Sequence, residues 1–187
     1  MAKGENFITK MLDDVPTESY GLRSFLKQRK NQVDRHTESL SDAALAIPEH
    51  RMTVLHSIYV AAVDGESAAV VVVPDAVEAM FIANWMHIIY ALTFGGVTYD
   101  VTYNTLAQEV RDNSRNIPMY QKNPFLIILF PELVSNAGWL QATLLDLIQT
   151  KRHVLILTAD PDKMKNAFGE LIIKTLNKMG ATSIVMD

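Results

Sequence analysis

Three short, wholly apolar runs constrain the fold of this chain more than any other feature. They occupy residues 68–73, 125–130 and 154–157, and each is followed along the chain by a segment with helical spacing. A strand that is apolar on both faces must be covered on both faces, as in parallel sheets flanked by helices. Valine, threonine and tyrosine predict two further strands at 97–103 and 182–186. We therefore expect an α/β fold with a doubly wound, mostly parallel five-stranded sheet.

Helices are predicted where apolar residues recur three or four positions apart. They cover residues 52–62, 76–92, 105–112, 140–149 and 162–179. Asn104 is the expected cap of the third helix, and residues 116–124 are expected to form a loop. Met52, Met80 and Met86 are expected to fill the core, as flexible thioether side chains commonly do.

The first fifty residues are predicted to form a helical segment that precedes the α/β domain of residues 51–187. Leu22, Phe25 and Leu26 fall there at helical spacing. The remaining faces carry basic side chains, namely Arg23, Lys27, Arg29, Lys30 and Arg35. A solvated helix surface accounts for these charges, and so does contact with DNA phosphates or with an acidic partner.

Composition excludes several kinds of site. The chain of 187 residues contains no cysteine, which excludes disulfides, thiolate zinc sites and cysteine nucleophiles. Its formal net charge of -4 argues against a surface coated with nucleic-acid-binding charge. The five histidines lack the spacing of metal ligands, so no metal is expected. The absence of cysteine fits the reducing cytoplasm.

Residues 76–94 form the longest apolar stretch and are nearly long enough to cross a bilayer. Glu78, Asn84 and His87 lie within this stretch, however, and each of them is costly in lipid. We therefore expect a buried helix of a soluble protein and no contact with a membrane.

The turn after the first apolar strand lacks the residues that bind phosphate. A P-loop needs glycines for close backbone approach, a lysine for the terminal phosphates and a hydroxyl for magnesium. After Val73 the chain instead continues with Pro74, Asp75, Ala76, Val77, Glu78, Ala79 and Met80. The two carboxylates would repel a triphosphate at close range. This degenerate turn predicts that no nucleotide cofactor is bound.

Polar residues follow two other strands, with two interpretations open for each. Glu132 comes after Pro131, a residue that cannot ligate metal, where a magnesium-binding aspartate normally stands. It is either a helix-entry or solvent carboxylate, or the remnant of a catalytic acid. Thr158 and Asp160 follow residues 154–157. Asp160 is either the cap of the next helix or a polar group of a ligand site.

The succession of elements over residues 53–187 resembles the helicase-loader branch of the AAA+ ATPases, including related ATP-binding helpers of transposition. The resemblance rests on the strand and long helix of 70–92, the strand and acidic residue of 126–132, and the helix and strand of 170–186. It implies an AAA+-like fold of the P-loop NTPase class. It is a match of layout and hydrophobic pattern.

The nucleotide residues of that family do not carry over. Its glycines, lysine and threonine would fall on Val73, Ala76, Glu78, Ala79 and Met80. Its first acidic residue would fall on Pro131, and only the companion acid is present, as Glu132. The polar sensor position would be Asp160, and the arginine of the last helix would be Lys174, which keeps the charge without the planar fork.

Three functions stay open from the sequence. The first is a non-enzymatic accessory of DNA replication or recombination. It would contact a replicative helicase or a related ATPase through its N-terminal helices. Binding of single-stranded DNA and formation of an oligomer also stay open. The second is a small-molecule enzyme that uses Glu132, Thr158 and Asp160 at the strand ends. The third is a structural subunit that pairs with an active paralogue. We favour the first, because a fold can be retained for its surfaces after its chemistry is lost.

Overall fold

A five-stranded parallel sheet forms the centre of the molecule. The computed structural model describes residues 46–94, 98–112, 116–135 and 138–186. The strands are β1 (Ala68–Val72), β2 (Thr98–Thr102), β3 (Phe125–Leu129), β4 (His153–Thr158) and β5 (Thr182–Val185). Their order across the sheet is β2-β3-β4-β1-β5, and every pairing among the described residues is parallel. The predicted α/β class and parallel sheet are confirmed.

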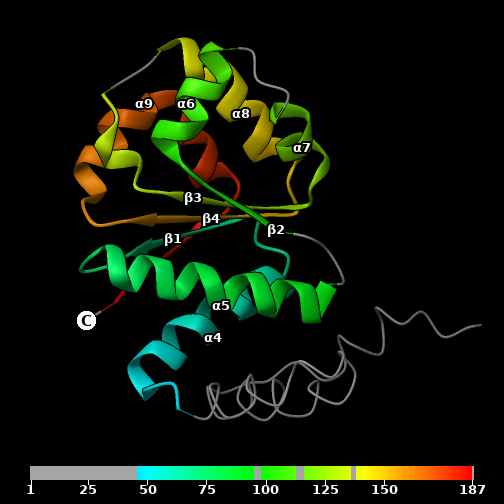
Figure 1. Cartoon of the computed structure of the whole chain (residues 1–187), viewed down its shortest axis with the longest axis vertical. Helices are drawn as coiled ribbons and strands as arrows, with labels where there is room; N and C mark the ends of the chain where they lie inside the picture. The colour runs from blue at the N-terminus through cyan, green and yellow to red at the C-terminus, as the bar shows by residue number, and fades with distance from the viewer. Residues whose placement is uncertain (1–45, 95–97, 113–115, 136–137, 187) are drawn as a thin grey trace, which may run out of the picture.

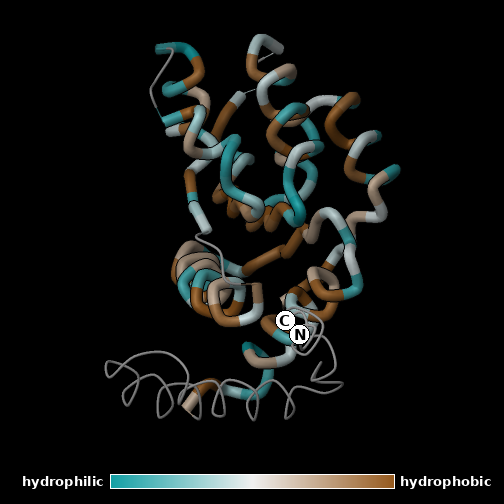
Figure 2. The backbone as a smooth tube through the Cα atoms, turned by 90° about the vertical axis from the view of Figure 1, so that its right-hand side faces the viewer, coloured by the Kyte–Doolittle hydropathy of each residue, from teal (hydrophilic) through white to brown (hydrophobic). Residues whose placement is uncertain are grey.

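Helices cover both faces of the sheet (Figure 1). On one face lie α4 (Glu49–Val63) and α5 (Ala76–Phe94). On the other lie α6 (Tyr103–Arg111), α7 (Ile117–Lys122), α8 (Gln141–Thr150) and α9 (Pro161–Lys178). Two short 3-10 helices, η2 (Pro131–Leu133) and η3 (Gly138–Leu140), follow β3. Figure 2 shows the apolar strands, in brown, between the two layers of helices, so the doubly wound arrangement is confirmed.

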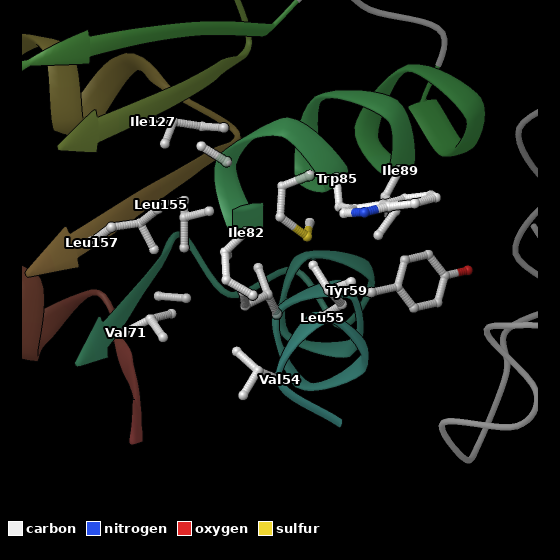
Figure 3. Close-up of a cluster of buried hydrophobic side chains, with 14 of the residues drawn as sticks. Val54, Leu55, Tyr59, Val71, Ile82, Trp85, Ile89, Ile127, Leu155 and Leu157 are labelled. Atoms are coloured by element: carbon white, nitrogen blue, oxygen red, sulfur yellow. The ribbon is translucent and has the colours of Figure 1, made fainter. Parts of the chain in front are cut away.

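The core beneath α4 and α5 accounts for the apolar side chains on the buried face of residues 76–94 (Figure 3). Ile82 and Ile89 of α5 pack with Leu55 of α4 and with Leu155 and Leu157 of β4, and none of the five has exposed surface. By length and composition, α5 is the one helix in the described part of the chain that would be able to cross a membrane. In this fold one face of α5 is taken up by the core.

The boundaries of α6 and α7 correct two sequence predictions. Thr102, rather than Asn104, caps α6, because its side chain accepts a hydrogen bond from the Thr105 backbone N–H at 3.1 Å. The region of 116–124, predicted as a loop, contains α7. A proline lies in the first turn of α7, where its missing N–H costs nothing. Six residues are too few for helical periodicity to show in the sequence.

The outer face of α5 corrects a third prediction. Met52 and Met86 are fully buried, as expected, whereas Met80 is 40% exposed. Met80 lies one turn beyond Val77, which is 71% exposed, so both side chains belong to the face that points away from the sheet. The prediction failed because α5 is apolar on nearly every face, and its buried side could not be recognised from the sequence alone.

Helix α9 is interrupted near its middle. Gly169 has φ 76° and ψ 166° inside the helix and is buried. A positive φ of this size is accessible to glycine and strained for residues with a side chain. Two helical segments therefore meet at Gly169.

The predicted boundary near residue 50 coincides with the beginning of α4, which packs against α5, β1 and β5. Residues 1–45, which include the five basic residues Arg23, Lys27, Arg29, Lys30 and Arg35, lie outside the described residues. The division into an N-terminal helical segment and an α/β domain therefore stays a prediction.

Candidate functional site

The turn between β1 and α5 lies at the carboxyl edge of the sheet, where open α/β sheets bind ligands. Only Val73, Pro74 and Asp75 connect Val72 to the first residue of α5. The Asp75 Oδ1 atom accepts hydrogen bonds from the backbone N–H groups of Val77 at 2.8 Å and Glu78 at 2.9 Å. A side-chain carboxylate thus takes the N-terminal amides that would otherwise be available to a phosphate.

Glu78, in the first turn of α5, forms an ion pair with Arg51 of α4. The Arg51 guanidinium also lies over the ring of Phe81, with its central carbon 4.4 Å from the ring centroid. The two side chains of the ion pair are largely covered, at 26% and 14% exposed, so water screens the pair only in part. Glu78 therefore joins α5 to α4, a contact that no feature of the sequence indicated.

Glu132 of η2 connects the ends of β3 and β4. Its Oε2 atom accepts a hydrogen bond from the Thr158 hydroxyl at 2.7 Å, and its Oε1 atom accepts one from the Ala159 backbone N–H at 2.8 Å. Phe130, directly after β3, has φ 54° and ψ 52° in the left-handed region. This turn leads the chain into η2, and the carboxylate of Glu132 then bonds to the end of β4.

Asp160 caps α9. Its Oδ1 atom accepts a hydrogen bond from the Lys163 backbone N–H at 3.0 Å, and its Oδ2 atom lies 3.0 Å from the Lys163 ammonium. The backbone hydrogen bond from Lys163, together with the Lys163 side chain, lowers the pKa of the Asp160 carboxyl below its ordinary value. The carboxylate is thus held ionised at the N-terminus of a helix, where a negative charge is favourable.

Lys174 forms an ion pair with Glu170 of the same helix, with 2.5 Å between Nζ and Oε1. Its side chain is 66% exposed. Pro131 is buried as the first residue of η2. Lys174 is thus paired with a carboxylate of its own helix, and the side chain of Pro131 has no atom that could bind a metal ion.

The structure brings some of the predicted site residues together and separates others. Glu132, Thr158 and Asp160 meet, because the Thr158 hydroxyl bonds to Glu132 and also lies 3.2 Å from the Asp160 backbone oxygen. Asp75 and Glu78 share the first turn of α5 but have different partners. In the described ranges, no group of three or more histidines and carboxylates is arranged to hold a metal ion.

Comparison with known proteins places the fold. No protein-family model and no curated protein matches the sequence. A solved structure of the replication initiator DnaA bound to AMPPCP and single-stranded DNA is similar, with 11% identity and a TM-score of 0.56 over 72% of this chain and 46% of that chain. A DNA replication initiation factor is similar with 10% identity and a TM-score of 0.56, over 76% of this chain and 48% of that chain. This chain therefore spans about half the length of the structures it matches. At this level of identity, the likeness shows a shared fold and nothing further about activity or partners.

Proposed function

We propose that this chain is a non-enzymatic accessory of DNA replication or recombination, similar in role to a helicase loader, that neither binds nor hydrolyses ATP. Its fold is that of replication initiators. The observation that carries the proposal is the Asp75 carboxylate, which bonds to the two backbone amides at the start of α5. A phosphate at this turn would have to displace that carboxylate and approach the Glu78 carboxylate as well.

The other acids of the carboxyl edge support the same proposal. Both oxygens of Glu132 accept hydrogen bonds from β4 or the residue after it, so a catalytic role for this carboxylate would have to share or displace these bonds. Proline occupies the preceding position, and a proline side chain has no atom that ligates magnesium. The residues that remain at these positions maintain the fold.

The proposed partner is a replicative helicase or a related ATPase in the cytoplasm. The basic residues Arg23, Lys27, Arg29, Lys30 and Arg35 are the proposed contact with that partner or with single-stranded DNA. Val77 and Met80 add apolar surface beside the degenerate turn, where they are 71% and 40% exposed. Exposed apolar side chains of this kind commonly mark protein contacts.

Calorimetric titration with ATP and magnesium tests the absence of a nucleotide site. We expect no measurable heat of binding with the natural chain or with Asp75→Asn, which keeps the cap and removes the charge. Micromolar, magnesium-dependent affinity of the natural chain would overturn the proposal. Binding gained only by Asp75→Asn would show that the Asp75 charge alone excludes the nucleotide.

Capture of partners from the native cell, followed by mass spectrometry, tests the role. Recovery of a hexameric helicase supports a loader-like accessory, whereas recovery of a related ATPase supports a structural subunit beside an active paralogue. A single-stranded DNA shift that is lost when Arg23, Lys27, Arg29 and Lys30 are replaced by alanine would assign the basic segment. A shift that persists in that variant would exclude the segment as the DNA contact.

The alternative is a small-molecule enzyme that uses Glu132, Thr158 and Asp160. The three residues do meet at the carboxyl edge, but their polar atoms bond to one another and to nearby backbone. A substrate would have to replace these bonds. A screen in which a small molecule raises the melting temperature of the natural chain but not of Glu132→Gln would favour the enzyme.

A further inference from the structure

A half-open groove lies on the α6 side of the sheet, apart from the β1–α5 turn. It encloses about 390 Å³, and the residues that matter for the argument are Asn104, Gln108, Arg111, Asp112, Ser135 and Trp139. One wall is α6, which begins where β2 ends, and the other is the segment that follows β3. Both walls thus belong to segments that follow a strand at its carboxyl end.

An indole ring and a guanidinium group offer two planar surfaces in this groove. Trp139 is 47% exposed, although tryptophan is usually well covered. The central carbon of the Arg111 guanidinium lies 5.3 Å from the Trp139 ring centroid, which restrains both side chains. Unpaired bases of nucleic acids stack on aromatic rings and on guanidinium planes, and such a pair is suited to hold one.

Polar side chains beside the two planes are available for hydrogen bonds. Asn104, Gln108 and Asp112 line the groove, and within the described part of the chain their side chains bond to no other group. The Asp112 carboxylate is an acceptor with two oxygens, whereas the amides of Asn104 and Gln108 both donate and accept. Guanine presents two adjacent donors, its ring N–H and its amino group, which a single carboxylate can accept together.

The local charge favours a base over a phosphate. Asp112 and Glu109 both lie beside Gln108, where a second, shallower hollow adjoins α6. Two carboxylates beside the single guanidinium of Arg111 leave the described side chains of this region without a positive excess. The charged residues that line the groove itself, Arg111 and Asp112, balance each other, so a phosphate gains no net attraction there, whereas the neutral edge of a base needs none.

We propose that this groove binds one unpaired guanine base, which stacks on the Trp139–Arg111 pair and donates two hydrogen bonds to the Asp112 carboxylate. The base belongs either to a single-stranded nucleic acid or to a free nucleoside. The groove does not depend on the partner proposed above, because it uses neither the N-terminal segment nor the β1–α5 turn.

Fluorescence of Trp139 tests this proposal on the full chain. The protein has two tryptophans, and Trp85 is only 9% exposed, so Trp85→Phe leaves Trp139 as the reporter. Three probes are used. The first is a ten-nucleotide single strand of thymidines with one central guanine, the second is the same strand with an abasic site in place of the guanine, and the third is free guanosine. We expect saturable quenching by the guanine oligonucleotide and binding at least about fivefold weaker by the abasic one.

Saturation by guanosine together with failure of the guanine oligonucleotide would support the groove and identify a free nucleoside as its ligand. Equal binding of the guanine and abasic oligonucleotides would overturn the proposal, as would the absence of saturable quenching by both guanine probes. If Trp85→Phe does not fold, the natural chain gives the same measurement after subtraction of the Trp139→Phe signal.

Substitutions in the groove separate recognition from folding. Asp112→Asn should weaken binding of the guanine oligonucleotide by about five- to 140-fold and leave the abasic oligonucleotide unchanged. Asp64→Asn, an exposed carboxylate at the end of α4 on the opposite face, is the matched control and should bind as the unsubstituted chain does. Equal affinity of Asp112→Asn and Asp64→Asn for the guanine oligonucleotide would contradict the assigned role of Asp112.

Discussion

At the carboxyl edge of the sheet, Asp75, Glu132 and Asp160 each accept a hydrogen bond from a nearby backbone N–H group. At the amino edge, His153 opens β4 without exposed surface, and its Nε2 atom has no hydrogen-bond partner in the described part of the chain. The carboxyl edge therefore places its carboxylates where nearby backbone groups satisfy them. The amino edge instead buries an ionisable group in its neutral form.

The surroundings of His153 explain that difference. Its Nδ1 atom lies 2.7 Å from the Tyr90 hydroxyl, and the Tyr90 ring stacks on Phe125 with 4.8 Å between centroids. Burial among these rings lowers the pKa of His153 to about 4 and raises the pKa of Tyr90 well above its ordinary value. Charge on the His153 ring is disfavoured because burial removes the hydration that the charged form requires. Substitution of the carboxylates at the carboxyl edge should therefore lower the free energy of unfolding at neutral pH. The contribution of His153 at the amino edge should instead be lost at acidic pH.

The largest effect is expected from Glu132→Ala. The substitution removes the charged acceptor of the Ala159 N–H and the nearer of the two acceptors of the fully buried Thr158 hydroxyl, and it should lower the free energy of unfolding by about 3 kcal/mol. Urea unfolding at pH 7.5 measures the loss. Glu170→Ala, which removes an exposed carboxylate of α9, is the control. A loss for Glu132→Ala no greater than that of the control would show that the bonds between β3 and β4 contribute little.

Acid sensitivity is expected to come next in size. The pKa of folded His153 is about 4, below the value of 6.5 for an unperturbed histidine, so the unfolded chain takes up the proton first. The stability contributed by neutral His153 is therefore present above about pH 6.5 and is lost as the pH falls toward 4. At pH 5 the loss should be about 2 kcal/mol.

The measured quantity is the difference in unfolding free energy between pH 7.5 and pH 5. We expect this difference to be smaller in His153→Gln than in the natural chain by about 2 kcal/mol. The exposed His50, changed to glutamine, is the matched control and should leave the pH dependence as it is. An identical pH profile for His153→Gln and the natural chain would contradict the contrast drawn between the two edges.

A smaller effect is expected at the β1–α5 turn. Asp75→Ala removes the cap of α5 and should lower the free energy of unfolding by about 1 kcal/mol. Asp75→Asn should lose much less, because an amide oxygen can accept the same hydrogen bonds. Urea unfolding of the two variants side by side measures the contribution. Equal losses would show that the charge of Asp75, rather than its hydrogen bonds, stabilises the helix.

The smallest effect is expected at Lys174. Its ion pair with Glu170 is exposed to solvent, so Lys174→Ala should change the unfolding free energy by less than about 0.5 kcal/mol. Thermal unfolding in low and high salt checks this. A larger loss that disappears in high salt would indicate that Lys174 belongs to a wider network of charges.

The strands were predictable because β1, β3 and β4 are apolar on both faces, and this pattern stands out in the sequence. The cap at Thr102 and the short helix α7 were not, because each depends on local backbone geometry over a few residues. At the candidate site, the sequence indicated which side chains stand at the strand ends. It did not indicate that Glu132 bonds to Thr158 or that Glu78 pairs with Arg51, because those contacts join segments 26 and 27 residues apart. Such contacts depend on the register between strands and on the docking of helices.

The interruption at Gly169 divides α9 into two helical segments. The first segment is capped by Asp160, which follows the hydrogen bond between Thr158 and Glu132. The second segment leads through Gly180 into β5. Both segments bury side chains in the same core, Met164 and Phe168 before the break and Ile172 and Leu176 after it, so the break redirects the helix between two sets of contacts. Replacement of Gly169 by a residue with a side chain would strain this positive φ and destabilise the junction of the two segments.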